Sequence, residues 1–153
     1  MTVTHGGMVT FNYSGQVLIV SPIGGATDIW LLPKGHIEPG EESWETAERE
    51  VDEEASIEAI ADTSSPLGTT VFQTDKGELV TTEWWAGLGR HYIPHEVGWS
   101  EADFRDTRWV SWQEALEKLS FQDQRNILRT ALCLPPELTE QQIIEELERG
   151  ITN

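Results

Sequence analysis

The chain has 153 residues, of which 27 are Asp or Glu and 10 are Lys or Arg, so its formal net charge is −17. This length suits a single domain with its own hydrophobic core. So large an excess of negative charge argues against stable nucleic-acid binding and against binding to an anionic membrane through bulk electrostatics. A polyanionic substrate would therefore need divalent cations in order to approach this surface.

Alternating apolar and turn-forming segments predict a chain of mixed strands and helices. Residues 6–20 predict two strands around a turn at 12–15, and residues 29–32 predict a short strand that leads into Pro33, Lys34 and Gly35. Further strands are predicted over 57–61, 68–74, 79–88 and 107–112, with a hairpin turn at 75–77. An irregular polar loop is predicted over 89–105, and amphipathic helices over 113–119 and 122–134.

The stretch between these strands, from Gly35 to Ile57, opens as a Gly/Pro-rich loop and continues as a helix that carries a bank of carboxylates. Glu50, Glu53 and Glu54 are spaced i, i+3, i+4 and therefore share one helix face. Like charges at this spacing destabilise an isolated helix by about 0.2–0.5 kcal/mol per pair. Composition alone would favour a solvated acidic face, whereas carboxylates gathered beside an apolar stripe are typical of a site for a hard cation such as Mg²⁺.

The order of the residues in this stretch resembles the Nudix box, Gly-x5-Glu-x7-Arg-Glu-U-x-Glu-Glu-x-Gly-U, where U is a bulky aliphatic residue. The positions that match in register are Gly35, Glu41, Arg49, Glu50, Val51, Glu53, Glu54 and Ile57. One position departs, because Ser56 stands where the family has its last glycine. That glycine follows the helix, where the backbone often adopts a left-handed conformation, so serine implies modest strain and no lost chemical group.

The resemblance covers roughly residues 5–134 and implies an α/β/α sandwich with a mixed central sheet. We therefore expect a hydrolase domain over 1–134 and a helical tail over 135–153, separated by Pro135 and Pro136, which stop the preceding helix. The tail predicts a further helix over 137–150 with one apolar side, which could pack on the domain or meet a second chain. We expect a monomer or a homodimer.

The resemblance also implies a Mg²⁺-dependent hydrolase, with Mn²⁺ as a substitute, in which Glu50, Glu53, Glu54 and the Gly35 carbonyl bind the metal. Glu50, with Glu53, is implied as the group that activates or orients the attacking water. Arg49 is implied to hold the glutamates in place.

Other box positions and a nearby loop carry further implied roles. Glu41 is the expected partner of Arg49, while Gly35, Val51 and Ile57 are structural positions. A further carboxylate from the loop beyond the long strand is implied, for which Glu96 and Glu101 are equal candidates.

The loop before the helix, W-L-L-P-K-G-H-I-E-P-G-E, is closest to the branch that contains diadenosine-polyphosphate and diphosphoinositol-polyphosphate hydrolases. Lys34 and His36 are the expected substrate contacts in this loop. The resemblance favours diadenosine polyphosphates as substrates, with ATP as a product. The alternatives are a mutator-type (d)NTP pyrophosphohydrolase and a catalytically silent nucleotide-binding module.

Tryptophan is frequent, with seven residues. We expect Trp44, Trp109 and Trp112 in the core. Trp84, Trp85 and Trp99 are candidates for base stacking, although core packing is the simpler prediction for each. No leader peptide or long apolar run is visible, and there is one cysteine, so we expect a cytoplasmic protein.

Overall fold

The computed structural model describes residues 2–22, 28–92 and 106–152. Its central feature is a mixed sheet of seven strands in the order β4-β6-β1-β2-β7, with β3 paired to β1 and β5 paired to β6. The strands are β1 (His5–Phe11), β2 (Val17–Val20), β3 (Lys34–His36), β4 (Ile57–Ala61), β5 (Gly68–Gln73), β6 (Leu79–Tyr92) and β7 (Thr107–Val110). The helices are α1 (Ser43–Ala55), α2 (Trp112–Lys118), α3 (Gln122–Ala131) and α4 (Glu140–Thr152).

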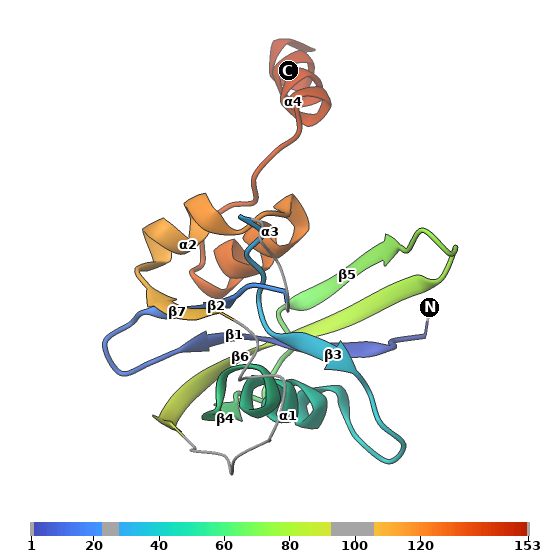
Figure 1. Ribbon diagram of the computed structural model, residues 1–153. Coiled ribbons are helices and arrows are strands. Elements are labelled where there is room, and N and C mark those ends of the chain that lie inside the picture. The colour runs from blue at the N-terminus through green and yellow to red at the C-terminus, as the bar shows by residue number, and fades with distance from the viewer. Residues whose placement is uncertain (1, 23–27, 93–105, 153) are drawn as a thin grey trace.

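The first strand organises the sheet, because β1 pairs with three other strands. It runs parallel to β6 from His5↔Thr82 to Phe11↔Leu88, and antiparallel to β2 and β3. Helix α1 lies on one face of the sheet, and α2 and α3 lie on the other (Figure 1). The α/β/α sandwich with a mixed sheet that the sequence predicts is therefore the observed fold.

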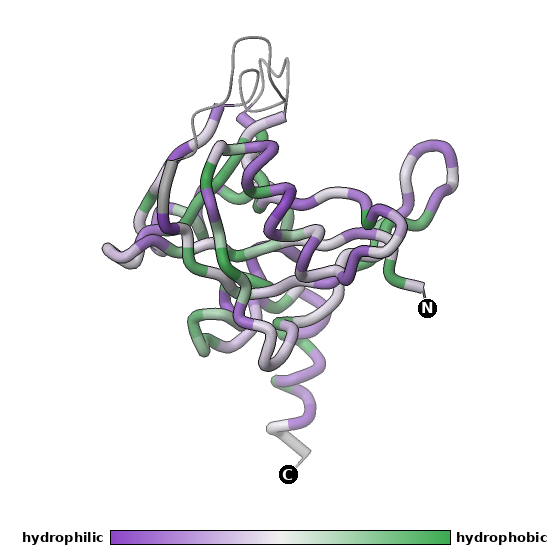
Figure 2. The backbone as a smooth tube through the Cα atoms, turned by 90° about the horizontal axis from the view of Figure 1, so that it is seen from below, coloured by the Kyte–Doolittle hydropathy of each residue, from purple (hydrophilic) through white to green (hydrophobic). Residues whose placement is uncertain are grey.

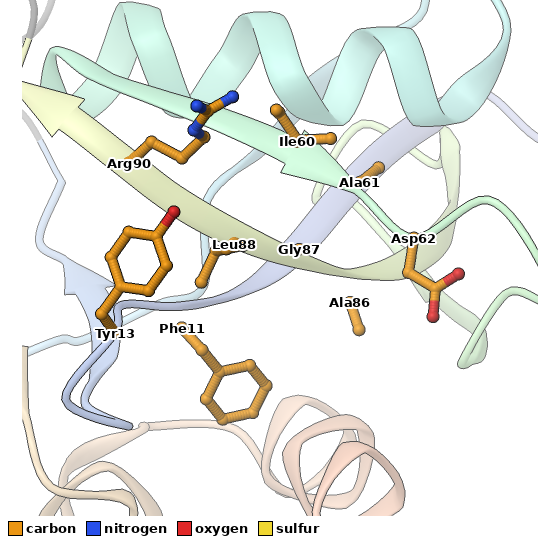
Figure 3. Close-up of a pocket in the computed structure, with 9 residues that line it drawn as sticks. All are labelled: Phe11, Tyr13, Ile60, Ala61, Asp62, Ala86, Gly87, Leu88 and Arg90. Atoms are coloured by element: carbon orange, nitrogen blue, oxygen red, sulfur yellow. The ribbon is translucent and has the colours of Figure 1, made fainter.

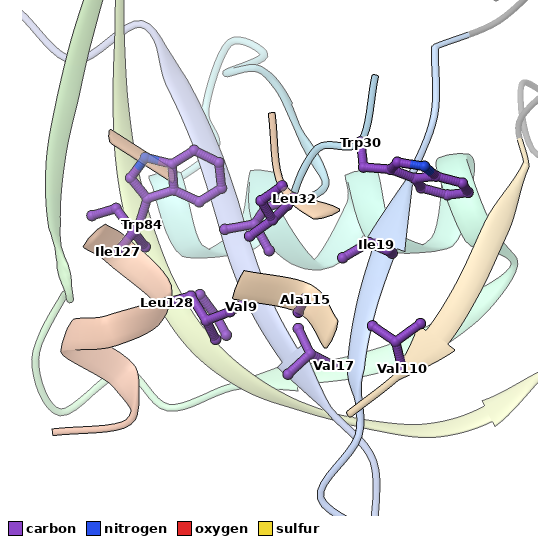
Figure 4. Packing of buried hydrophobic residues seen from close by; sticks show 11 residues of the cluster. Val9, Val17, Ile19, Trp30, Leu32, Trp84, Val110, Ala115, Ile127 and Leu128 are labelled. Atoms are coloured by element: carbon purple, nitrogen blue, oxygen red, sulfur yellow. The ribbon is translucent and has the colours of Figure 1, made fainter. Parts of the chain in front are cut away.

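Side chains of adjacent strand residues alternate between two cores, as a pleated sheet requires. Met8, Leu18 and Trp85 pack under α1, whereas their neighbours Val9, Val17 and Trp84 pack under α2 and α3 (Figure 4). Figure 2 views the molecule from the side of α1, whose coil is largely hydrophilic. The apolar side of α1 instead meets the sheet through the buried Ala47, Val51 and Ala55.

The predicted strand over 29–32 is wrong, because only Leu31 forms a bridge there, with Val20. The backbone N–H groups on either side are satisfied by side chains instead of a strand. Trp30 N–H donates to Ser120 Oγ, and Leu32 N–H donates to Gln124 Oε1. The strand lies farther along as β3, which pairs with Gly6 and Gly7 of β1.

Other predicted bounds shift by a few residues. β6 continues to Tyr92, beyond the predicted end at residue 88, because it keeps pairing with β4. Trp112 starts α2 instead of ending β7, since Ser111 Oγ accepts the Glu114 N–H as an N-cap. α3 ends at Ala131, and Cys133 beyond it has a left-handed φ of 58°.

The C-terminal helix α4 begins at Glu140, and its side chains are exposed over 140–150. Its apolar residues Ile143, Ile144 and Leu147 face solvent. Within the described part of the chain, no helix is long and apolar enough to span a membrane.

Ser56 adopts the left-handed conformation predicted for it, with φ 57° and ψ 36°, and its N–H donates to the Asp52 carbonyl. Replacing Ser56 by glycine should raise the free energy of unfolding by about 0.5–1 kcal/mol, because glycine reaches this region without a Cβ penalty. Urea unfolding measures the change. Ser56→Ala is the control, because it removes the buried hydroxyl but keeps Cβ; an equal gain in that variant would contradict the backbone explanation.

Candidate active site

Helix α1 is held tightly against β1 at its start. A Cβ at Gly6 would lie 2.1 Å from the Ser43 carbonyl oxygen, so only glycine allows this approach. At the same end, the Glu45 carboxylate accepts the Glu42 N–H at 3.0 Å. An acidic residue in the first turn also complements the helix dipole.

Arg49 joins four groups from three segments. Its guanidinium donates to both oxygens of Glu41 (2.8 and 3.0 Å), to Glu50 Oε1 (2.9 Å) and to Glu53 (3.1 Å to Oε2). It also donates to the His36 carbonyl at 2.8 Å, which ties β3 to α1. These bonds lower the pKa of Glu41 to about 2, mainly through the hydrogen bond from Arg49, and raise the pKa of Arg49. Arg49 and Glu41, for which the resemblance implies a partnership, are thus hydrogen-bonded to each other.

Gly35 lets the glutamates approach the backbone of β3. A Cβ at Gly35 would lie 2.1 Å from Glu50 Oε1, so any other residue would displace that carboxylate. Glu50 and Glu54 are buried at 7% and 3% exposure. Glu54 thus lies at the edge of the buried face of α1. A simple division of the helix into an acidic face and an apolar face would instead turn Glu54 away from the sheet.

The carboxylates line an open cleft of about 330 Å³. Its walls are Lys34, Gly35, His36, Glu38, Arg49, Glu50, Glu53 and Glu54. Four glutamates face Lys34 and Arg49 in this cleft, so these six charged side chains leave an excess of two negative charges. Among the described residues, no three His, Cys, Asp or Glu side chains already stand in a metal-binding arrangement.

The side chains of this cleft nevertheless fit a divalent cation. Apart from His36, the side chains of the cleft that can act as metal ligands are carboxylates, which hard cations prefer. Two of the carboxylates are buried, and buried carboxylates need compensating positive charge. Arg49 supplies one such charge but divides it among four glutamates.

The family model described as NUDIX domain matches residues 2–131. The chain belongs to the Nudix family. It is accordingly a Nudix hydrolase, an enzyme that acts on phosphorus-containing acid anhydrides, and this family generally uses divalent metals.

Several characterised relatives are similar to this Nudix hydrolase. An asymmetrical bis(5'-nucleosyl)-tetraphosphatase from Caenorhabditis elegans is 30% identical over 101 residues, which are 65% of this chain and 71% of that protein. The pig enzyme of the same name is 32% identical over 106 residues, covering 65% of this chain and 67% of its own. An RNA pyrophosphohydrolase from Rhodopseudomonas palustris is 37% identical over 59 residues, only 35% of either chain. A crystal structure of a C. elegans Ap4A hydrolase binary complex has the same fold, with a TM-score of 0.67 at 20% identity over 86% of this chain and 96% of that one.

The tryptophans do not provide a stacking surface at the two described candidate positions. Trp84 and Trp85 are buried in the two cores, at 0% and 8% exposure, which is the core packing given as the simpler prediction. Trp44 and Trp109 pack against the α1 core, whereas Trp112, expected in the core, is 37% exposed. Trp99 lies outside the described residues, as do Glu96 and Glu101.

A second cavity lies next to the acidic cleft and is lined by two aromatic residues that the sequence did not indicate. Phe72 of β5 and Phe121 before α3 are 43% and 49% exposed and face a cavity of about 240 Å³. Lys34 lines both spaces, and its ammonium lies 5.3 Å from the centre of the Phe72 ring. The sequence offers no periodic signal for this pair, because Phe72 and Phe121 belong to separate segments.

A larger hollow lies elsewhere and lacks the chemistry of a Nudix site. It is a shallow groove of about 510 Å³ beside β4 and β6, with Tyr13, Leu88 and Ile60 along it (Figure 3). Asp62 and Arg90 are its charged residues. One carboxylate does not make a site for a divalent cation, so the groove is not a second catalytic centre.

A histidine pair borders the cleft where β1 meets β3. The rings of His5 and His36 lie 4.0 Å apart, and Thr4 Oγ1 is 2.7 Å from His5 Nδ1. Burial, followed by the nearby charges of His36 and Lys34, lowers the pKa of His5 to about 4. His5 is therefore neutral in the folded chain throughout the neutral and mildly acidic range.

The lowered pKa of His5 predicts a loss of stability on acidification. Between pH 6.5 and 4 the unfolded chain protonates His5 and the folded chain does not, so stability falls as the pH drops through this window. By pH 5 the loss amounts to about 2 kcal/mol. In His5→Asn, urea unfolding at pH 7.5 and pH 5 should show a smaller acid loss than in the parent chain. An unchanged pH dependence would contradict the assignment, and comparison with the parent cancels the titration of the other groups.

Proposed function

We propose that this Nudix hydrolase cleaves dinucleoside polyphosphates asymmetrically, diadenosine tetraphosphate among them, with Mg²⁺ held by the carboxylates of α1. A nucleoside triphosphate, ATP in the case of diadenosine tetraphosphate, is one product. The observation that carries the proposal is that Lys34 forms a wall of both the acidic cleft and the aromatic cavity. A polyphosphate in the cleft can therefore have its base in the adjoining cavity.

The aromatic cavity suits one base. Phe72 and Phe121 expose large apolar surfaces to it, and stacking of a base on an aromatic ring is worth about 1–3 kcal/mol. A chain of four phosphates is long enough to engage the glutamates and Lys34 together. The similarity to asymmetrical bis(5'-nucleosyl)-tetraphosphatases supports the same substrate class.

Each box residue takes a role consistent with its position. Glu50, Glu53, Glu54 and the Gly35 carbonyl hold the metal, which neutralises phosphate charge and lowers the pKa of bound water. Glu50, assisted by Glu53, orients the attacking water and accepts its proton. Arg49 keeps the carboxylates in position.

The substrate-facing residues lie beside this centre. Lys34 and His36 contact phosphoryl oxygens, because both line the same cleft as the glutamates. Residues 1–134 act as the hydrolase domain and 135–153 as a tail, which agrees with a family match that ends at residue 131.

Two other activities are less consistent with these observations. The RNA pyrophosphohydrolase similarity covers a third of the chain, and a net charge of −17 opposes binding of an RNA strand. A single (d)NTP has a shorter phosphate chain and would engage either the glutamates or Lys34, but not both. Binding without catalysis does not require the complete set of Arg49, Glu50, Glu53 and Glu54.

Removal of the metal should abolish turnover. Hydrolysis of diadenosine tetraphosphate should stop in EDTA and return with Mg²⁺ or Mn²⁺, because the cleft carries uncompensated negative charge. Glu54→Gln keeps the shape of the buried side chain but removes its charge, and should lower kcat by about 100-fold or more. Glu58→Gln is the matched control, since Glu58 is exposed on β4. Activity that persists in chelator would rule out the metal site.

The substrate class is tested with diadenosine tetra-, penta- and hexaphosphates, (d)NTPs, ADP-ribose, a nucleotide sugar and a diphosphoinositol phosphate. Chromatography should show ATP and AMP from diadenosine tetraphosphate. Phe72→Ala or Phe121→Ala should raise KM for it about tenfold, since a stacked base is lost. Tyr13→Ala, in the groove beside β4 and β6, is the control and should leave KM unchanged.

Cleavage of (d)NTPs alone would establish the mutator-type activity instead, and nucleotide binding without any turnover would establish a silent module.

A further inference from the structure

The aromatic cavity also carries polar groups, both supplied by the first turn of α3. Asp123 and Gln124 line it beside Leu31, Phe72 and Phe121. Gln124 is 5% exposed, and its Oε1 accepts the Leu32 N–H at 2.8 Å. That bond fixes the orientation of the amide, so the remaining group is the Nε2 donor. Within residues 2–22, 28–92 and 106–152, Nε2 has no hydrogen-bond partner.

Asp123 places acceptors next to this donor. One oxygen, Oδ1, accepts the Gln124 N–H at 2.8 Å. The other oxygen makes no hydrogen bond with any residue that the structure describes. An ionised carboxylate only accepts hydrogen bonds and can bind two neighbouring N–H groups. The cavity therefore combines the amide donor of a buried glutamine with a charged acceptor.

Guanine matches this pair more fully than the other bases. Its Watson–Crick edge carries an O6 acceptor followed by the N1–H and N2–H donors, whereas adenine has one donor group, N6–H₂, and an acceptor at N1. Gln124 Nε2 can donate to O6 while the Asp123 carboxylate receives N1–H and N2–H. Adenine can satisfy Gln124 and one carboxylate bond but has no second donor. Uracil and cytosine likewise offer a single donor position.

We propose that the aromatic cavity binds guanine in preference to adenine, with Asp123 and Gln124 as the residues that determine this specificity. The inference rests on the proposed function, since it takes the cavity as the base site of that substrate. It names guanosine-containing dinucleoside polyphosphates as the better substrates within the class. Hypoxanthine, which keeps O6 and N1–H but lacks the N2 amine, makes one bond with each residue, as adenine does, and should rank with adenine below guanine.

The test compares kcat/KM of the full chain with Mg²⁺ on diguanosine, diinosine and diadenosine tetraphosphates. One additional charge-assisted hydrogen bond corresponds to about tenfold or more in selectivity, so diguanosine tetraphosphate should be favoured over the diadenosine compound by that factor. Asp123→Asn removes the charge and one acceptor, and should bring the ratio close to one mainly by slowing the guanosine substrate. Asp106→Asn, at an exposed residue before β7, is the matched control and should keep the ratio.

The outcomes separate this inference from the proposed function. If both dinucleotides are cleaved at equal rates, or if Asp123→Asn leaves a guanine preference intact, the specificity is overturned while the function stands. If neither is cleaved, the proposed function fails, and titration calorimetry with GMP and AMP decides the base preference alone. Tenfold tighter binding of GMP that Asp123→Asn abolishes would support it, and equal affinities would overturn it.

Discussion

The structure of the site depends on the charge of Arg49. One guanidinium reaches Glu41 from the loop, Glu50 and Glu53 from α1, and the His36 carbonyl from β3. These groups would otherwise repel each other or leave a buried carboxylate unpaired, which costs several kcal/mol. Because Arg49 is only 22% exposed, water screens these interactions incompletely. The positions of loop, strand and helix are thus set by electrostatics as much as by apolar packing.

The sequence predicted the features that are encoded locally. The carboxylates of α1 share one side because i, i+3 and i+4 spacing is a property of the helix itself. The left-handed backbone at Ser56 follows from its place directly after that helix. Core packing was the simpler prediction for Trp84 and Trp85, and the structure buries them in opposite cores because side chains alternate along a strand. The family resemblance was needed to arrange these pieces in an α/β/α sandwich.

What the sequence did not predict depends on contacts between distant segments. The 29–32 segment has the composition of a strand, yet its donors are satisfied by Ser120 and Gln124 from the other end of the domain. The aromatic cavity is equally non-local, because Phe72 and Phe121 come from separate elements and neither is part of a motif. An exposed phenylalanine is a weak signal in a sequence, since much of any protein surface is apolar. Only the three-dimensional structure shows that Phe72 and Phe121 line the same cavity as Lys34.

The parallel pairing of β1 with β6 has a consequence for how the enzyme folds. Backbone contacts such as Thr4 N–H to the Thr81 carbonyl join residues that are 77 positions apart. Contacts of such long range are slow to form, since the closure of a long loop costs entropy before it gains any interaction. β1 supports both β3 and the start of α1, so the acidic cleft cannot be complete until the polypeptide has extended past β6. During synthesis, α1 is therefore made after β1, β2 and β3 but before β4 to β7, so the helix exists before the sheet that holds it is complete.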